Sequence, residues 1–154
     1  MIQLSFTPPE KSSPWSKTWD SVTWDDPAAI SEIDLRYKYF GVNFEMVVDD
    51  VEIVSKKRFV TLVDLALSLS GVMKRISSGE DAAFGFTESD EVIHLICDGN
   101  LISVTSSKSL VQASVGRKEL LDEFSRFLRE VHYRLVLNIP GLSKNPVIWR
   151  FYSE

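Results

Sequence analysis

The sequence predicts an α+β protein: an antiparallel β-sheet of about five to seven strands with two amphipathic helices packed on one face. Three observations lead to this prediction. Several short segments alternate apolar and polar residues, which is typical of strands with one buried face. Two longer segments repeat apolar residues at three- and four-residue steps, which is typical of amphipathic helices. Turn-forming residues separate the segments at short intervals.

The alternating segments predict strands at residues 2–6, 33–39, 42–48, 51–54, 82–86, 93–97 and 102–104, with turns near Gly41, Asp49-Asp50 and Ser89-Asp90-Glu91. Asp98-Gly99 is a strong signal for a two-residue hairpin turn. Such a turn places Leu95 opposite Ile102 and Ile93 opposite Val104. All four side chains then face the same side of the sheet, so the register and the hydrophobic pattern agree.

The first predicted helix begins after Thr61, whose hydroxyl is expected to cap the first turn, with Asp64 reaching back as in a capping box. It ends at residues 77–79. The second predicted helix covers residues 117–138, and Pro140-Gly141 stops it. Their buried stripes contain Leu62, Leu65, Ala66, Leu69, Val72, Met73 and Ile76, and then Leu120, Leu121, Phe124, Phe127, Leu128, Val131 and Leu135.

The 154 residues are expected to form one domain, because a chain of this length buries enough surface to fold without disulfides or a bound metal. Within it, residues 1–31 supply a strand and a tryptophan-containing covering segment. Residues 32–138 form the α+β core, and residues 139–154 form a tail whose residues 147–152 are either an edge strand or a loosely docked terminus.

Trp15, Trp19 and Trp24 lie within ten residues of each other in a segment that lacks periodicity. One interpretation is that this segment lies over the core as a loop or short helix and buries a large apolar area. The other is that the indoles form an aromatic patch for a partner, since tryptophan is favoured at interface hot spots.

Composition excludes several classes of protein. The start of the chain has neither the basic nor the apolar region of a signal peptide, and no apolar run approaches the length of a membrane span. Cys97 is the single cysteine, so no internal disulfide can form. We therefore expect a cytoplasmic protein that does not associate with membranes.

The residues able to perform chemistry are few, and the sequence predicts neither a catalytic residue nor a metal or cofactor site. His94 alternates within a strand, and His132 lies one step off the buried stripe of a helix without a serine or cysteine nearby. Cys97 alternates with Leu95 and Ile93 on an apolar strand face, where a cysteine behaves as a small hydrophobe and is a poor nucleophile. Each is interpreted as structural.

The second helix carries five basic residues, but acidic residues are interleaved with them, as Asp122 is with Arg126. This mixture is typical of a solvated helix face, although a nucleic-acid surface is the alternative. The middle of the chain argues against nucleic acid. Residues 41–100 hold 11 acidic and 5 basic residues, whereas phosphate contacts need lysine and arginine.

No basic residue occurs between Arg75 and Lys108, and the acidic residues there occupy predicted turns. Turns are usually polar, so these residues are either ordinary solvated loops or a single-sign field that steers a cationic partner. The second interpretation predicts a partner-binding surface of acidic residues with aromatic anchors. Its members are Asp49, Asp50, Glu80, Asp81, Glu88, Asp90, Glu91, Trp15 and Trp19.

The segments LVDLALSLSGVMKRISSGEDAAFGFTESDEVIHLICDGNLISVTSS and VGRKELLDEFSRFLREV resemble, in layout and composition, small bacterial immunity proteins of polymorphic toxin systems. The resemblance covers roughly residues 33–138. It implies a small, acidic, cytoplasmic and non-catalytic protein that covers the active site of a cognate toxin. The acidic turns themselves predict that this toxin presents a basic cleft. The alternative function is a homodimeric structural or regulatory module.

Overall fold

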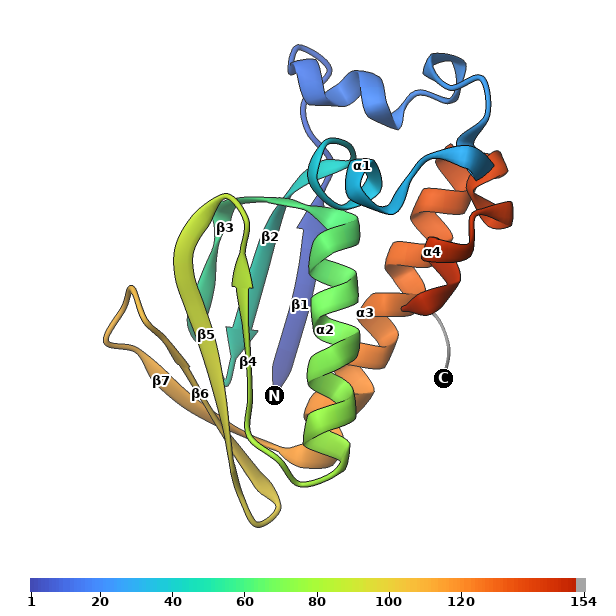
Figure 1. Ribbon diagram of the computed structural model, residues 1–154. Coiled ribbons are helices and arrows are strands. Elements are labelled where there is room, and N and C mark those ends of the chain that lie inside the picture. Colours follow the sequence, from blue (N-terminus) through green and yellow to red (C-terminus); the bar gives the residue numbers. More distant parts are fainter. Residues whose placement is uncertain (152–154) are drawn as a thin grey trace.

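Seven strands form two antiparallel sheets in the computed structural model, which describes residues 1–151 (Figure 1). The first sheet has the order β1-β2-β3 and the second has the order β4-β5-β6-β7, so each is a meander of sequential strands. The strands are β1 Ile2–Thr7, β2 Gly41–Val48, β3 Val51–Thr61, β4 Ala82–Phe86, β5 Ser89–Asp98, β6 Leu101–Ser106 and β7 Gln112–Gly116. The predicted α+β class is confirmed, with the strands divided between two sheets.

The two long helices, α2 (Leu62–Ser77) and α3 (Arg117–Asn138), lie side by side and close one side of the molecule (Figure 1). α2 packs next to β4, and α3 packs next to β1, so the pair connects the two sheets. Both helices have the predicted bounds. Leu69 and Phe124, which lie central in the predicted stripes, are fully buried.

The core lies where the inner faces of both sheets meet the helices. Phe44 on β2 packs against Phe86 on β4 at a ring-centroid distance of 6.4 Å and against Phe127 on α3 at 5.6 Å. Phe127 also meets Phe6 on β1 edge to face. This aromatic cluster joins four elements of the fold, β1, β2, β4 and α3, and each ring buries roughly 150–250 Å².

The predicted strand at residues 33–39 is wrong, because α1 (Glu32–Tyr37) occupies this segment. Ser31 caps the helix by accepting a hydrogen bond from the Asp34 N–H, and Lys38 pairs with Asp34 across one turn. Leu35 is the buried residue of the helix, whereas Ile33 is largely exposed. Local capping and i,i+4 pairing thus outweigh a seven-residue alternation.

The hairpin between β5 and β6 keeps the predicted face but not the predicted register. Leu95 pairs with Val104, not Ile102, because Gly99-Asn100 forms the turn and Asp98 pairs with Leu101. Gly99 has φ 63°, a left-handed conformation that glycine adopts without steric cost. A shift of two residues preserves the side of each side chain, so the apolar residues stay inside.

The predicted turn at Ser89-Asp90-Glu91 is also wrong. These residues begin β5, and the chain turns earlier, at Thr87-Glu88.

The segment after β1 forms three short 3₁₀ helices, η1 (Pro14–Trp19), η2 (Ser21–Thr23) and η3 (Pro27–Ala29). Trp19 packs on Phe40 at a centroid distance of 5.3 Å, and Trp24 packs on Tyr39 at 4.5 Å. This packing supports the interpretation of a segment that covers the core.

The C-terminal region is a docked helical segment and not the predicted strand or loose terminus. η4 (Pro140–Lys144) leads into α4 (Pro146–Arg150), whose Val147 and Ile148 are buried. Buried Asn145 caps α4 by accepting the Val147 N–H, and its amide donates to the carbonyls of Pro27 and Ile30. One side chain therefore fixes both the helix start and its contact with η3. Tyr152, at the end of the predicted segment, lies outside the described residues.

Candidate partner-binding surfaces

The predicted acidic surface divides between two ends of the molecule. Asp49-Asp50 follows β2, and Glu80-Asp81 precedes β4, so both lie at the lower end in Figure 1. Glu88 and Asp90 lie beside the β4–β5 turn at the upper end. β5 contains ten residues, so its two ends are roughly 30 Å apart. The predicted residues therefore form two separate acidic groups and not one continuous surface.

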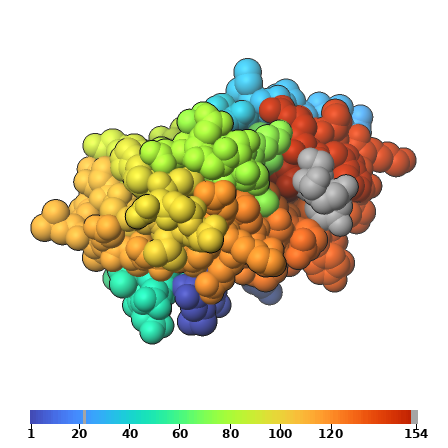
Figure 2. All heavy atoms as spheres, turned by 90° about the horizontal axis from the view of Figure 1, so that it is seen from below, coloured from blue at the N-terminus to red at the C-terminus, as the bar shows by residue number. Residues whose placement is uncertain are grey.

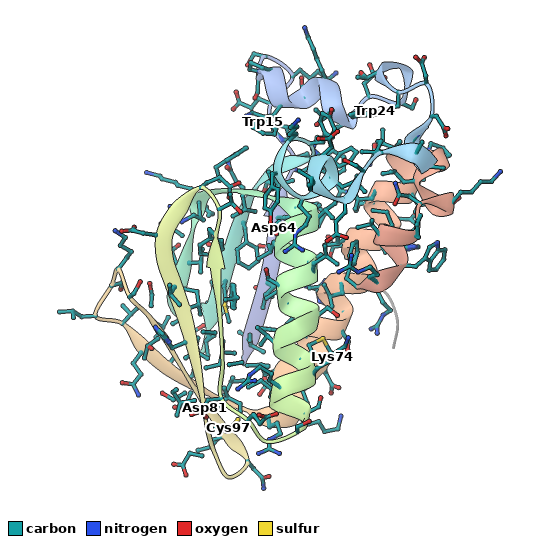
Figure 3. The ribbon with its side chains drawn as sticks, in the orientation of Figure 1. Trp15, Trp24, Asp64, Lys74, Asp81 and Cys97 are labelled. Atoms are coloured by element: carbon teal, nitrogen blue, oxygen red, sulfur yellow. The ribbon has the colours of Figure 1, made fainter. Side chains whose placement is uncertain are left out.

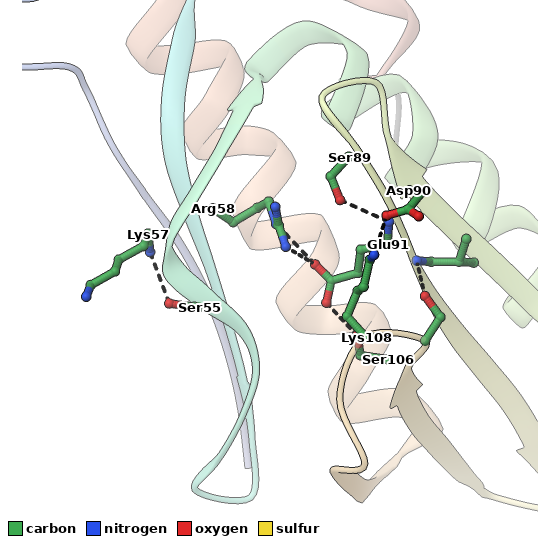
Figure 4. Close-up of polar contacts among 10 residues, drawn as sticks. Ser55, Lys57, Arg58, Ser89, Asp90, Glu91, Ser106 and Lys108 are labelled. Carbon is green, nitrogen blue, oxygen red and sulfur yellow. Dashed lines mark hydrogen bonds and ion pairs between the residues drawn. The ribbon is translucent and has the colours of Figure 1, made fainter.

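Glu91 does not belong to any exposed surface. Its residue exposure is 5%, and its carboxylate accepts two hydrogen bonds from Arg58 on β3, at 3.1 and 2.7 Å (Figure 4). Its other oxygen accepts from the Ser106 hydroxyl on β6. The Arg58 guanidinium also lies 5.7 Å from the ring centroid of Phe86. Glu91 joins the two sheets and must be removed from the predicted partner-binding set.

The other two acidic residues at the upper end are exposed but have partners within the chain. Asp90 pairs with Lys108 at 2.6 Å, and the hydrogen bond from Lys108 lowers the pKa of the Asp90 carboxyl (Figure 4). Glu88 accepts a hydrogen bond from the Thr61 hydroxyl at 3.2 Å. That bond also corrects the predicted capping of α2, because the Thr61 side chain makes no cap hydrogen bond. The charge of Asp90 is thus partly balanced, and Glu88 helps to anchor the β4–β5 turn.

Asp64, the predicted partner in the capping box, is buried and has a different role. One carboxylate oxygen accepts from Arg36 on α1 at 2.8 Å, and the other accepts from the Thr87 hydroxyl at 2.9 Å. Asp64 therefore connects α1, α2 and the β4–β5 turn.

At the lower end, the Asp81 carboxylate accepts the backbone N–H of Cys97 at 2.8 Å (Figure 3). The Cys97 thiol is directed to the carbonyl of Glu80 at 3.4 Å. Glu80 itself pairs with Arg75 at 3.7 Å, and both side chains are 57% exposed. Asp81 and Glu80 thus hold the α2–β4 connection against β5 while remaining exposed.

Asp49 and Asp50 differ from the other predicted residues. Both are exposed, and among the described residues neither carboxylate makes a hydrogen bond or ion pair. They form the two central residues of the β2–β3 turn, with φ of 50° and 65°. In Figure 2, this turn is the teal group that projects at the lower edge of the view. These two carboxylates are the most available for a partner in the predicted set.

Trp15 and Trp19 belong to η1, which lies at the upper end of the molecule in Figure 1, and both are half-buried. Trp15 packs on Phe59 of β3 at 5.0 Å, and Trp19 donates its indole N–H to the carbonyl of Gly41. A Cβ at Gly41 would lie 2.4 Å from Phe59 and 2.9 Å from Trp15, so the indole and the phenyl ring require glycine there. Trp15 also borders a shallow cavity of about 320 Å³.

The three residues interpreted as structural occupy separate places. His94 is exposed on the outer face of the second sheet, Cys97 lies at the lower end, and His132 packs against Trp149 at a centroid distance of 4.6 Å. Burial lowers the pKa of His132. In the described part of the chain, no group of three or more His, Cys, Asp or Glu residues could hold a metal ion.

A further surface was not predicted from the sequence. Tyr133 and Leu137 on α3 are exposed by 61% and 60%, and Trp149 on α4 is exposed by 46%. A cavity of about 410 Å³ lies beside them, against the end of α3 and Pro140. The sequence did contain a signal for this surface. Tyr133 and Leu137 are large apolar residues at i,i+4 spacing that lie outside the buried stripe of the same helix.

No family model matches the chain, and comparison with curated proteins and solved structures finds no match either. Among residues 1–151, no helix has the length and hydrophobicity that a membrane-spanning helix requires.

Proposed function

We propose that the protein is a non-catalytic binding protein that neutralises a cognate bacterial toxin in the cytoplasm by occluding the toxin's active site. The observation that carries the proposal is the projecting turn at Asp49-Asp50, whose two exposed carboxylates have no side-chain partner among the described residues. The expected partner is a protein with a basic cleft. Nucleic acid does not fit this role, because its phosphates would be repelled by the same carboxylates.

The conformation of this turn supports a role outside folding. Two-residue hairpin turns with positive φ at both positions favour Asn-Gly or Asp-Gly, because glycine adopts this conformation without strain. Here both positions are aspartate, with φ of 50° and 65°. Asp49 matches this preference, whereas Asp50 stands where glycine is favoured, at a cost on the order of 1 kcal/mol. The two adjacent negative charges also repel each other, so this pair of aspartates is unfavourable for the fold. Binding to a basic protein surface offers a reason why the pair is retained.

The proposed mechanism places this turn in the toxin's cleft. The carboxylates steer the encounter over about a Debye length, roughly 8 Å at physiological salt. Glu80 and Asp81 lie at the same end of the molecule and contribute to the same field. Glu91 has no part in this mechanism, and Glu88, Asp90, Trp15 and Trp19 lie at the opposite end. A partner-binding role for those four residues stays a prediction about a separate surface.

The test begins with the reading frame next to the gene. Its product is expressed in a bacterial host with or without this protein, and growth rescue identifies it as the cognate toxin. Association of the two purified proteins is then measured by stopped-flow mixing at several salt concentrations. Asp49→Asn with Asp50→Asn removes both charges, and asparagine tolerates the left-handed conformation, so the turn is retained.

The double variant is expected to associate roughly tenfold more slowly at low salt and to lose most of its salt dependence. The matched control, Glu88→Gln with Asp90→Asn, also removes two exposed carboxylates, but at the other end of the molecule. It should associate like the wild type. Equal, salt-independent rates for all three proteins contradict the role of the acidic turn, and a neighbour whose product is harmless contradicts the toxin partner.

A further inference from the structure

The C-terminal half of α3 presents apolar side chains to solvent. Tyr133 and Leu137 lie one turn apart and are exposed by 61% and 60%. Trp149 of α4 lies nearby, since its indole packs on His132, the residue directly before Tyr133. Large side chains gathered in this way on a folded surface mark an interaction site more often than isolated exposed residues do. We call this group, together with the cavity beside it, the α3–η4 patch.

The cavity in the α3–η4 patch has a volume of about 410 Å³, and its lining is mainly apolar. Val136, Leu137 and Pro140 form its apolar walls, with Tyr133 and His132 alongside, and Arg129 lies at one edge. Arg129 is exposed, and within residues 1–151 no carboxylate pairs with it. The cavity therefore offers an apolar pocket with a cation at its rim, a combination suited to an aromatic ring.

The N-terminal half of α3 has a different character. There Lys118 pairs with Asp122, and Arg126 pairs with both Glu123 and Glu130. The charges of this half are thus balanced along its own surface. The exposed apolar residues begin one turn further along the helix, at Tyr133, where Arg134 beside it still pairs with Glu130.

We propose that the α3–η4 patch binds a second copy of this chain, with the two α3 helices antiparallel about a two-fold axis. Tyr133 of each copy then enters the cavity of the other and lies beside its Arg129. An isologous interface requires one surface to supply both the projecting group and the cavity that receives it. The α3–η4 patch carries both, which is why the second copy is preferred here over an unrelated protein.

The exposed area of the three large side chains can form the centre of such an interface but not the whole of it. Tyr133, Leu137 and Trp149 together expose roughly 350 Å² per copy, a little under half of the ~800 Å² that each partner buries in a stable interface. Arg129, Val136 and Pro140 supply more area around this centre. Tyrosine, tryptophan and arginine are also the residue types enriched at the centres of protein interfaces.

This inference does not rest on the proposed function. Tyr133 lies sixteen residues beyond the start of α3, which is roughly 24 Å along the helix axis. The Asp49-Asp50 turn lies at the end of the molecule where α3 begins, so a dimer leaves that turn accessible. The two proposals can therefore fail separately.

The test is the mass in solution, measured by sedimentation equilibrium from about 1 μM to 1 mM. The wild type should pass from the 17.5 kDa monomer to twice that mass as its concentration rises. Leu137→Glu places a carboxylate in the patch, and Arg129→Glu removes the cation at the rim of the cavity. Each should weaken dimerisation at least tenfold. The matched control is Leu110→Glu, because Leu110 is fully exposed in the β6–β7 loop, outside the patch.

Circular dichroism melts of all three variants check that the fold is retained. A wild type that stays monomeric up to 1 mM overturns the proposal, as does a Leu137→Glu variant that dimerises like the Leu110→Glu control. Two further measurements address other occupants. A chain lacking residues 152–154 that dimerises where the full chain does not assigns the patch to the protein's own terminus. Cosedimentation of a monomeric wild type with phosphatidylserine vesicles, lost in Leu137→Glu, assigns it to a lipid surface.

Discussion

Arg58 on β3 and Glu91 on β5 form the ion pair that joins the inner faces of the two sheets, at 2.7 Å. The Glu91 side chain is 6% exposed, whereas that of Arg58 is 31% exposed. Only the Glu91 carboxylate of this pair is therefore buried, whereas the Arg58 guanidinium reaches solvent. Ser106 completes it by donating to the second carboxylate oxygen (Figure 4).

Replacing Glu91 with leucine should lower the free energy of unfolding by about 2–4 kcal/mol, because it leaves Arg58 and the Ser106 hydroxyl without their acceptor. The partial exposure of Arg58 places the expected loss toward the lower end of this range. Urea unfolding measures it. The double variant Arg58→Met with Glu91→Leu should recover much of the loss, because it buries no unpaired charge. If Glu91→Leu is as stable as the wild type, the Arg58–Glu91 pair does not have the role assigned to it.

Leu69 and Phe124 test the packing of the helix layer. Both are fully buried, one on α2 and one on α3. Truncating either to alanine should cost about 2–5 kcal/mol, through lost transfer free energy and a residual cavity. Lys74→Ala on the exposed face of α2 is the control, and its effect should stay within about 0.5 kcal/mol. Denaturant melts showing similar losses at all three positions mean that the helices are rotated from their assigned faces.

The long elements could be predicted from the sequence, because repeated burial along them leaves a strong periodic signal. α2 and α3 follow stripes that run over four or more turns, and the alternation in β2 runs through eight residues. Short segments carry less signal. In α1, the alternation of Ile33, Leu35 and Tyr37 matches a strand, but the Ser31 cap and the i,i+4 ion pairs decide for a helix.

The candidate site was harder to predict because the sequence shows charge but not pairing. Glu91 and Asp90 are adjacent and both acidic, yet Glu91 faces the core while Asp90 faces solvent. Their pairing with Arg58 and Lys108 depends on how two sheets meet, which no local pattern encodes. For α4, a local signal did exist. Asn145-Pro146 places a capping residue before a proline at the first helical position, which is a helix-start pattern.

The edge of β1 that has no neighbouring strand gives a third prediction. The Leu4 N–H donates to Glu123 on α3 at 2.8 Å, and the Leu4 carbonyl accepts from Arg126 at 2.7 Å. These side chains occupy the place that a neighbouring strand would take and so protect the sheet edge. Glu123→Ala should speed hydrogen exchange of the Leu4 amide roughly fivefold, equivalent to about 1 kcal/mol of local protection. Asp122→Ala, which removes an exposed carboxylate one position away, should leave that exchange rate unchanged.

Glu32 gives a prediction of pH dependence. Its carboxylate on α1 accepts hydrogen bonds from Arg150 on α4 and Arg36, and these bonds lower the pKa of the Glu32 carboxyl. A carboxyl whose pKa is lower in the folded state than in the unfolded chain stabilises the fold at pH above its ordinary value of about 4.3. That stabilisation is lost as the pH falls through the lowered pKa. Glu32→Gln removes the titrating charge and should therefore be less stable than the wild type at pH 7.

The difference between wild type and Glu32→Gln should shrink as the pH falls below about 4 and vanish once the carboxyl is protonated in both states. Urea unfolding of both proteins at pH 7 and at pH 3 measures this change. Glu10→Gln, at an exposed position in the loop after β1, is the control for removing one negative charge. Its free energy of unfolding should equal that of the wild type at both pH 7 and pH 3. If Glu32→Gln is less stable than the wild type by the same amount at pH 3 as at pH 7, the contact of α4 with α1 depends on side-chain shape and not on the charge of Glu32.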